Sequence, residues 1–191
     1  MKLVTVSGAH AAGKNEIAKI QFAAFGEDVL HRMVPCTTRK PRNGEVHGRE
    51  YYYLEEDEFE RLFQDDQFVY HVHIRKHRSG TIWSEFIRNE ISLVDITPEG
   101  ARCMRDLIRN EALGSALLIF VDAPPEQRKA RILKRQSDLH PDAVEKMISL
   151  DPVAGDPSLY RDFDLVVQNP DGGLVEAAET VRRAIERFLT S

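Results

Sequence analysis

The sequence predicts a three-layer α/β fold in which helices cover both faces of a parallel β-sheet. Apolar runs of buried-strand length alternate along the chain with segments whose apolar residues recur at helical spacing. A glycine-containing turn separates the first such strand from the first helix. Because strand, crossing helix and parallel strand form the repeating unit of such sheets, this alternation indicates one α/β core.

The elements of this core follow in order from the apolar pattern. The first strand is expected over residues 2–7, and the helix after it carries Ile17, Ile20 and Phe25 at roughly helical spacing. Three further strands, each with a helix after it, are expected at residues 91–96 and 98–110, 116–123 and 125–136, and 164–169 and 174–189. Each pair supplies one strand to the sheet and one helix to a face of it.

Two stretches interrupt the alternation. Turn residues and basic side chains dominate residues 33–80, within which residues 55–64 have helical character and residues 66–75 alternate like a half-exposed strand. This stretch predicts a small inserted lobe built on antiparallel strands. Residues 134–156 are charged and interrupted by proline and glycine, which indicates a second excursion from the core.

Composition and charge limit the functions of this fold. The 191 residues are 42% hydrophobic and 30% charged, as in an ordinary folded domain, and the net charge of −5 argues against nucleic acid and anionic membranes as partners. Only Cys36 and Cys103 are present, which favours a reducing compartment. The first apolar run ends at Gly8, too early for a signal peptide, and no run reaches the length of a membrane span. We therefore expect a cytoplasmic protein.

The turn after the first strand matches G-x-x-x-x-G-K, the pattern of a phosphate-binding loop. Small residues allow successive backbone N–H groups to curl around phosphate oxygens, and the helix start adds partial positive charge. A lysine is otherwise disfavoured in the first turn of a helix, so Lys14 favours a loop that binds phosphate over a helix that merely begins after a flexible turn. The predicted ATP-binding residues of this segment are Gly8, Ala9, His10, Ala11, Ala12, Gly13, Lys14 and Asn15.

Asn15 departs from the pattern where a Ser or Thr hydroxyl usually binds Mg²⁺. An amide oxygen is also a hard ligand, although it is bulkier and placed differently, so Asn15 is a candidate Mg²⁺ ligand. Asparagine is also tolerated near a helix start for structural reasons alone. The sequence leaves open whether this loop belongs to an altered working site or to an inactive one. The side chain of His10 is expected to face solvent or neighbouring residues rather than a ligand.

A second motif follows the loop. The segment TTRKPRNGEVHGREY, residues 37–51, resembles the T-T-R-x-P-R-x-G-E-x-x-G-x-x-Y pattern of the guanylate kinases at every fixed position. Its basic residues beside a turn also suit the clamping of a phosphate group. The segments SGT (79–81), LVDI (93–96), APPEQRKARILKR (123–135) and DFDLVVQN (162–169) follow in the order of that family. The resemblance therefore covers nearly the whole chain.

This resemblance implies a single domain with a P-loop kinase core, an inserted acceptor-binding lobe and a helical lid. The core would span about residues 1–33, 81–130 and 157–191, the lobe about 34–80 and the lid about 131–156. The implied activity is transfer of the γ-phosphoryl group of ATP, with Mg²⁺, to a nucleoside monophosphate. Catalysis needs mainly positioning and charge neutralisation, because an acceptor phosphate is already a nucleophile.

The resemblance also assigns roles to residues by their position in the family pattern. Lys14 and Arg39 would be catalytic, as would Arg131 and Arg135, which would contact the ATP phosphates and the charge that develops during transfer. The acceptor phosphate would be bound by Arg39, Arg42 and Tyr51, while Asp95 would lie near the metal and the acceptor, and Asn169 near the adenine.

The positions that read the base depart from the family pattern. The glutamate that reads guanine corresponds to Tyr70, a serine before T-T-R to Pro35, and the second aspartate of D-x-D to Thr97, whereas Thr81 matches. A phenol carries no charge at neutral pH and cannot imitate a carboxylate facing the N–H groups of guanine. We therefore expect an acceptor site that includes Tyr70, Thr81, Asp95 and Thr97 and that does not prefer GMP.

Two further segments depart from the family. Residues 73–78, HIRKHR, are basic where the family has a mostly neutral loop. They would either bind a second anionic group of the acceptor or only balance the acidic helix beside them. Met147 stands where another lid arginine is expected, and loss of such a cation would slow phosphoryl transfer.

Three interpretations follow. The first is a nucleoside monophosphate kinase with altered base recognition and a small phosphorylated acceptor, acting as a monomer or a homodimer. The second is a sugar-phosphate kinase similar to the ribose 1,5-bisphosphate kinases, which carry aspartate at the position of Asn15 but lack the full T-T-R pattern. The third is a non-catalytic guanylate kinase-like module that binds a phosphorylated partner, which Asn15 and Met147 favour.

Overall fold

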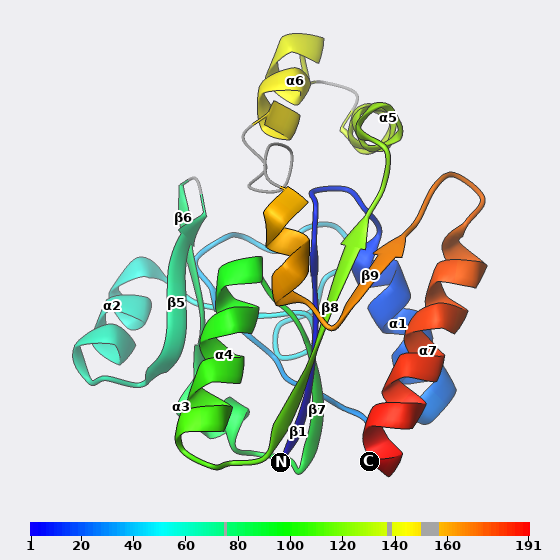
Figure 1. Cartoon of the computed structure of the whole chain (residues 1–191). Helices are drawn as coiled ribbons and strands as arrows, with labels where there is room; N and C mark the ends of the chain where they lie inside the picture. The colour runs from blue at the N-terminus through cyan, green and yellow to red at the C-terminus, as the bar shows by residue number, and fades with distance from the viewer. Residues whose placement is uncertain (75, 137–138, 150–156) are drawn as a thin grey trace.

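The computed structural model describes residues 1–74, 76–136, 139–149 and 157–191, and a parallel sheet lies at its centre (Figure 1). The strands lie in the order β2-β7-β1-β8-β9 and all pair in parallel. They are β1 (Lys2–Gly8), β2 (His31–Arg32), β7 (Ile91–Asp95), β8 (Ser115–Asp122) and β9 (Leu165–Gln168). The sequence predicts all of them to within one residue at each end except the edge strand β2, which is too short to show a periodicity.

Helices cover both faces of the sheet, which confirms the predicted three layers (Figure 1). On one face α1 (Lys14–Phe25) packs with α7 (Leu174–Thr190) over a core that includes Val6, Ile17 and Val181. On the other face lie α4 (Pro98–Asn110) and the 3₁₀-helix η1 (Pro157–Asp162), with Phe120 of β8 buried beneath them. Within the described residues, no helix combines the length and the apolarity needed to cross a bilayer.

A second, smaller sheet lies beside this core in the order β4-β3-β6-β5. Its strands are β3 (Cys36–Thr37), β4 (Tyr52–Tyr53), β5 (Phe68–Ile74) and β6 (His77–Ile82); α2 (Glu56–Gln64) packs on it, and α3 (Trp83–Phe86) leads back to the core. Phe59 of α2 is buried and stacks on Phe68 with 4.4 Å between ring centroids. The expectation of antiparallel strands holds for β5-β6 and β3-β6 but is wrong for β3-β4, which pair in parallel because the chain between them crosses back before β4 begins.

The helices α5 (Pro125–Arg135) and α6 (Pro141–Ser149) lie beyond the carboxyl ends of the core strands (Figure 1). They pack together through Ile132, Val144 and Ile148, and α6 falls within the predicted second excursion. Residues 137–138 and 150–156 of that excursion lie outside the described residues.

The strand ends bring polar residues to one edge of the sheet. The loop after β1 begins at Gly8, β7 ends at Asp95, β8 ends at Asp122 and Asn169 directly follows β9. In open parallel sheets, ligands bind outside the carboxyl ends of the strands. This edge is therefore the candidate site.

Candidate active site

The loop between β1 and α1 has a backbone shape that only its glycines permit. Gly13 has a φ of +96°, and a Cβ atom on it would lie 2.4 Å from the Nδ2 atom of Asn169. At Gly8, where φ is +149°, a Cβ atom would lie 2.0 Å from the carbonyl oxygen of Val121. Because the loop lies directly against β8 and the turn after β9, any other residue at these two positions would collide with its neighbours.

Backbone N–H groups at the end of this loop are available to an anion. The N–H groups of Ala11, Gly13 and Lys14 donate no hydrogen bond to any described residue. Free N–H groups at a helix start, together with the partial positive charge of the helix, form a phosphate-binding site. The Nζ atom of Lys14 also lies over the loop, where it donates to the carbonyl oxygens of Gly8 and Ala9 at 3.1 Å each.

A cavity of about 40 Å³ lies between α1, β2, β7 and the residues that directly precede β3 and β4. Asn15, Arg32, Tyr51 and Asp95 are among the residues that line it. Burial raises the pKa of Asp95, and the charges of Lys14 and Arg32 oppose that rise. The structure thus brings three predicted site residues, Asn15, Tyr51 and Asp95, to one cavity.

Arg32 is a cavity residue that the sequence reasoning missed. Its guanidinium group stacks on the ring of Phe22, 3.9 Å from the ring centroid. Its Nε atom is buried and donates no hydrogen bond within the described part of the chain. The available signal was a basic residue inside the apolar run just before T-T-R, in a strand too short to be predicted.

The basic turn of the smaller sheet is organised by a carboxylate. Glu45 accepts hydrogen bonds from both Nη atoms of Arg39, at 2.9 and 3.1 Å, from the Arg42 backbone N–H at 2.7 Å and from the Tyr53 hydroxyl at 2.9 Å. Partial burial opposes its ionisation, but these hydrogen bonds keep the pKa of Glu45 below its ordinary value. Burial raises the pKa of Tyr51, whose ring lies 5.4 Å from the Arg39 guanidinium carbon, so its hydroxyl stays protonated.

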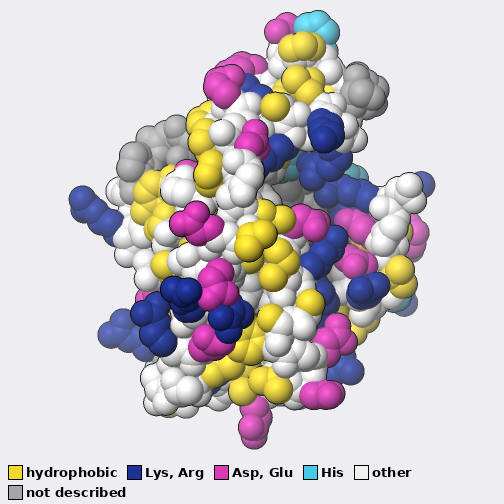
Figure 2. Space-filling view, turned by 90° about the vertical axis from the view of Figure 1, so that its right-hand side faces the viewer, with side chains coloured by type: hydrophobic (Ala, Val, Ile, Leu, Met, Phe, Trp, Pro, Cys, Tyr) yellow, Lys and Arg dark blue, Asp and Glu magenta, His cyan; other side chains and the backbone are white. Residues whose placement is uncertain are grey.

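The charge of Arg42, in this turn, acts on Arg135 at the end of α5. Partial desolvation, and then the charge of Arg42, lower the pKa of Arg135. Neither side chain donates a hydrogen bond or forms an ion pair among the described residues. The space-filling view shows Lys and Arg side chains gathered around a hollow below the upper part of the molecule (Figure 2). Such an unpaired pair of arginines suits an anion with several oxygens.

Arg131 and Asn169 lie against the outer side of the phosphate loop. The Nη1 atom of Arg131 donates to the Ala11 carbonyl at 3.4 Å, and the Nδ2 atom of Asn169 donates to the Ala12 carbonyl at 2.7 Å. Asn169 is only 4% exposed, and its Oδ1 atom accepts no hydrogen bond from the described residues. Both predicted residues therefore contact the loop that the sequence predicts to bind ATP.

Tyr70 and Thr97 come together from two parts of the chain. Their hydroxyl oxygens lie 2.8 Å apart, and the Thr97 oxygen also accepts a hydrogen bond from the Gly100 N–H at 3.2 Å. Thr81 is buried and opposite Tyr70 in the β5-β6 register. The two positions where the family has carboxylates therefore form one uncharged hydroxyl pair.

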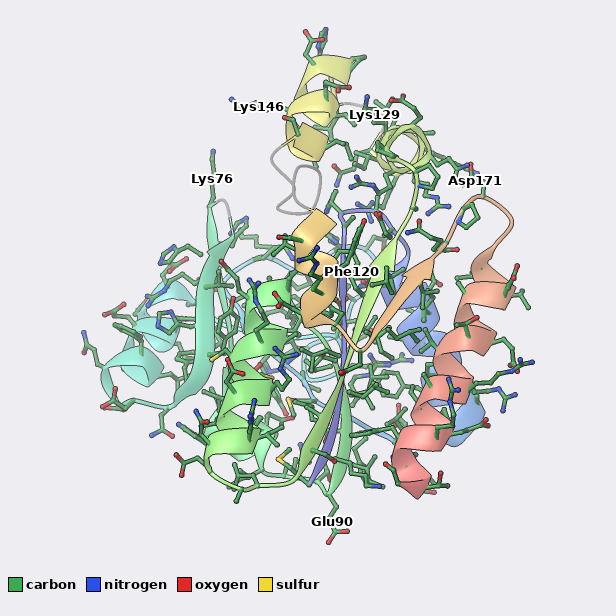
Figure 3. The ribbon with its side chains drawn as sticks, viewed as in Figure 1. Lys76, Glu90, Phe120, Lys129, Lys146 and Asp171 are labelled. Carbon is green, nitrogen blue, oxygen red and sulfur yellow. The ribbon has the colours of Figure 1, made fainter. Side chains whose placement is uncertain are left out.

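The basic side chains of residues 73–78 lie in two different environments. Arg75 lies outside the described residues, while His73, Lys76 and His77 are exposed, with Lys76 at the tip of the β5-β6 hairpin (Figure 3). Arg78 instead pairs with Glu60 of α2, so this arginine contributes to the packing of the lobe.

Met147 lies in apolar surroundings. Met147 packs beside the cluster of Ile132, Val144 and Ile148 that joins α6 to α5. The Nζ atom of Lys129 also connects the two helices through an ion pair with Glu145. No cluster of three or more His, Cys, Asp or Glu side chains suited to a metal occurs among residues 1–74, 76–136, 139–149 and 157–191.

Comparisons with known proteins agree with this geometry. A family model described as guanylate kinase matches residues 1–188. The chain is 31% identical over 191 residues to a guanylate kinase of Rubrobacter xylanophilus, covering 96% of this chain and 95% of that protein. It is 29% identical over 171 residues to a guanylate kinase of Polaromonas sp., covering 87% of this chain and 79% of the relative.

A solved structure shows the same fold. The crystal structure of guanylate kinase from Anaplasma phagocytophilum superposes with a TM-score of 0.68 at 19% identity, covering 98% of this chain and 84% of that one. The family match extends over almost the whole chain, and the resemblance carried by the T-T-R segment is confirmed. This chain belongs to the guanylate kinase family.

Proposed function

We propose that this protein transfers the γ-phosphoryl group of ATP to the phosphate of a nucleoside monophosphate. The observation that carries the proposal is the set of free N–H groups at Ala11, Gly13 and Lys14, at the edge of the sheet where ligands bind. Arg42 and Arg135, whose side chains form no ion pair among the described residues, add a second positive site. Two positive sites suit a phosphoryl donor and a phosphorylated acceptor.

The reaction would proceed by positioning rather than by proton abstraction. The loop and Lys14 would bind the β- and γ-phosphates, while Arg39, Arg42 and Tyr51 would bind the acceptor phosphate. An acceptor oxygen forms a bond to the γ-phosphorus as the bond from that phosphorus to the leaving oxygen of ADP breaks. Arg131 and Arg135 would neutralise the charge that develops on the transferred group.

Asn15 and Asp95 fit a Mg²⁺ ion. Both line the same cavity, an amide oxygen and a carboxylate are hard ligands, and neither side chain is hydrogen bonded within the described residues. When bound, Mg²⁺ supplies charge neutralisation at the phosphate oxygens. We propose these two residues as its ligands.

We propose further that GMP is not the preferred acceptor. The Tyr70 and Thr97 hydroxyls are uncharged and hydrogen bond to each other, and the Thr97 oxygen also accepts from the Gly100 N–H, which reduces the accepting capacity left for the N–H groups of guanine. A site that cannot accept these hydrogen bonds discriminates against the base that needs them. Together with Thr81 and Asp95, this pair would line the base-binding side of the acceptor site.

The base proposal is tested by comparing kcat/KM for GMP with values for the other ribo- and deoxynucleoside monophosphates. We expect GMP to be at least about tenfold below the best acceptor, and the double variant Tyr70→Glu, Thr97→Asp to raise the GMP value while KM for ATP stays unchanged. GMP as the best acceptor of the unmodified protein would contradict the proposal.

Asn15 and the apolar position of Met147 favour a second candidate, a module that binds a phosphorylated partner without catalysis. A thermal shift assay separates the two. For a kinase, ATP with Mg²⁺ raises the melting temperature, and Lys14→Ala loses that rise. No rise in either protein would favour the binding module. Adding ribose bisphosphates to the acceptors in the kcat/KM comparison tests the sugar-phosphate kinase alternative.

A further inference from the structure

The loop N–H groups that donate to no described residue belong to peptide units whose carbonyl groups accept hydrogen bonds. The Ala11 N–H shares its peptide unit with the His10 carbonyl, which accepts from Arg128 at 3.5 Å. The peptide unit that carries the Gly13 N–H also carries the Ala12 carbonyl, which accepts from Asn169 at 2.7 Å. In the same way, the Lys14 N–H shares its peptide unit with the Gly13 carbonyl, which accepts from the Ile17 N–H at 3.1 Å. A peptide unit is planar, with its N–H and C=O groups on opposite sides. Binding the carbonyl on one side therefore directs the N–H to the other.

The Ala11 carbonyl accepts from Arg131, and its peptide unit carries the Ala12 N–H, which donates to the Ala9 carbonyl at 3.2 Å within the loop. The guanidinium group of Arg131 is itself fixed by Asp171. The Nε and Nη2 atoms of Arg131 donate to one carboxylate oxygen of Asp171 at 3.1 and 2.8 Å, and Nη2 also donates to the Asn169 carbonyl at 2.9 Å. The Asp171 backbone N–H in turn donates to Gln127 at 2.8 Å. Figure 3 shows Asp171 in the turn between β9 and α7, beside α5. One acidic residue thus joins this turn to α5 and, through Arg131, to the loop.

We propose that Asp171 is a positioning residue for ATP binding. By orienting Arg131, which binds the Asn169 backbone carbonyl, it fixes the turn from which the Asn169 side chain holds the Ala12 carbonyl outward and so leaves the Gly13 N–H available. The contact of Arg131 with the Ala11 carbonyl holds the loop in place from the same side. Arg131 retains an N–H group on Nη1 beyond the one bound to Ala11, with which it can contact a phosphate oxygen. The inference rests on the proposed function in taking ATP as the ligand.

The pair of variants Asp171→Asn and Asp171→Glu tests this role. Asparagine keeps the shape but removes the charge that fixes Arg131, while glutamate restores a carboxylate. Glu126→Gln is the matched control, because Glu126 is an exposed carboxylate of α5 that pairs with Lys129 at 3.0 Å and does not contact the loop. Two quantities are measured on the whole protein: amide hydrogen exchange of the segment 8–17 without ligand, and the dissociation constant of ATP with Mg²⁺.

We expect Asp171→Asn to speed exchange in this segment several-fold, because the loop loses its outer support, and to weaken ATP binding about five- to tenfold. Asp171→Glu should recover most of both effects, and Glu126→Gln should match the unmodified protein. Unchanged loop exchange in Asp171→Asn, or ATP affinity within twofold of the unmodified protein, would overturn the proposal. If the unmodified protein binds no ATP while loop exchange rises in Asp171→Asn, the proposed function fails and the positioning of the loop by Asp171 stands.

Discussion

At the scale of single residues, the predicted phosphate site depends on Gly13 having no Cβ atom. Its left-handed backbone brings the Ala12 carbonyl to Asn169, and the space for a Cβ atom is already taken by the Asn169 amide, 2.4 Å away. The free N–H groups next to it depend on this close approach. The loop therefore joins two segments far apart in sequence at one point.

We predict that Gly13→Ala abolishes measurable ATP binding and lowers the free energy of unfolding by about 1–3 kcal/mol, because alanine is strained at this φ and collides with Asn169. Isothermal titration with ATP and chemical denaturation measure the two effects. Gly172→Ala is the matched control, since Gly172 has a φ of +81° but nothing within 4 Å of its Cβ position. Equal losses in both variants would show that backbone strain alone, rather than contact with Asn169, explains the result.

At the scale of elements, the turn after β3 is shaped by Glu45, which binds Arg39, Tyr53 and the Arg42 backbone. We predict that Glu45→Gln raises KM for the acceptor about tenfold and leaves KM for ATP unchanged, because Arg39 loses its orientation toward the acceptor. Steady-state kinetics with each substrate varied in turn measure this. A rise in both KM values would contradict a role confined to the acceptor side.

The same carboxylate makes stability depend on pH. The folded-state pKa of Glu45 is lowered from 4.5, so its contribution is present above about pH 4.5 and is lost as pH falls through the lower folded value. The free energy of unfolding of the unmodified protein should exceed that of Glu45→Gln by about 2 kcal/mol at pH 7, and the gap should narrow progressively as the pH falls below 4.5. Urea denaturation at several pH values checks this; a gap that is independent of pH would contradict it.

A buried carboxylate in α3 holds together the segment in which the chain passes from the smaller sheet back to the core. Glu85 accepts hydrogen bonds from the Val34 N–H at 3.2 Å, the Tyr52 hydroxyl at 3.0 Å and Arg88 at 2.9 Å. We predict that Glu85→Gln lowers the free energy of unfolding by about 2–3 kcal/mol, because an amide cannot accept at all three positions. Glu90→Gln, at an exposed position, is the control and should change it by less than about 0.5 kcal/mol.

The helices and strands differ in how well the spacing of apolar residues predicts them. The long strands β1, β7 and β8 and the helix α4 are predicted from apolar spacing because each buries a continuous face. The strands β2 and β3 could not be predicted from apolar spacing, because each has only two residues and a periodic pattern needs more. The direction in which the strands of the smaller sheet pair could not be predicted from the sequence either, since it depends on the path of the connecting loop rather than on local sequence.

At the scale of the whole molecule, the sequence indicates which residues gather at the carboxyl edge of the sheet but not how they bind one another. The phosphate-loop motif predicts Lys14 and Asn15, and the family resemblance implies Asp95 near the same site. Asn15 and Asp95 line one cavity, and the charge of Lys14 acts on Asp95. Contacts such as that of Tyr70 with Thr97, or of Arg131 with Asp171, join segments whose relation only the fold creates. Such pairs leave no local signal in one sequence.

ATP consumption by the purified protein tests the central claim most directly. ADP formation would be measured with Mg²⁺ and each ribo- and deoxynucleoside monophosphate or ribose bisphosphate in turn, beside the Lys14→Ala variant. We predict ADP formation that depends on at least one nucleoside monophosphate, is slower with GMP than with the best acceptor, and is lost in Lys14→Ala. No ADP formation with any acceptor, or equal rates in Lys14→Ala, would contradict the proposed phosphoryl transfer.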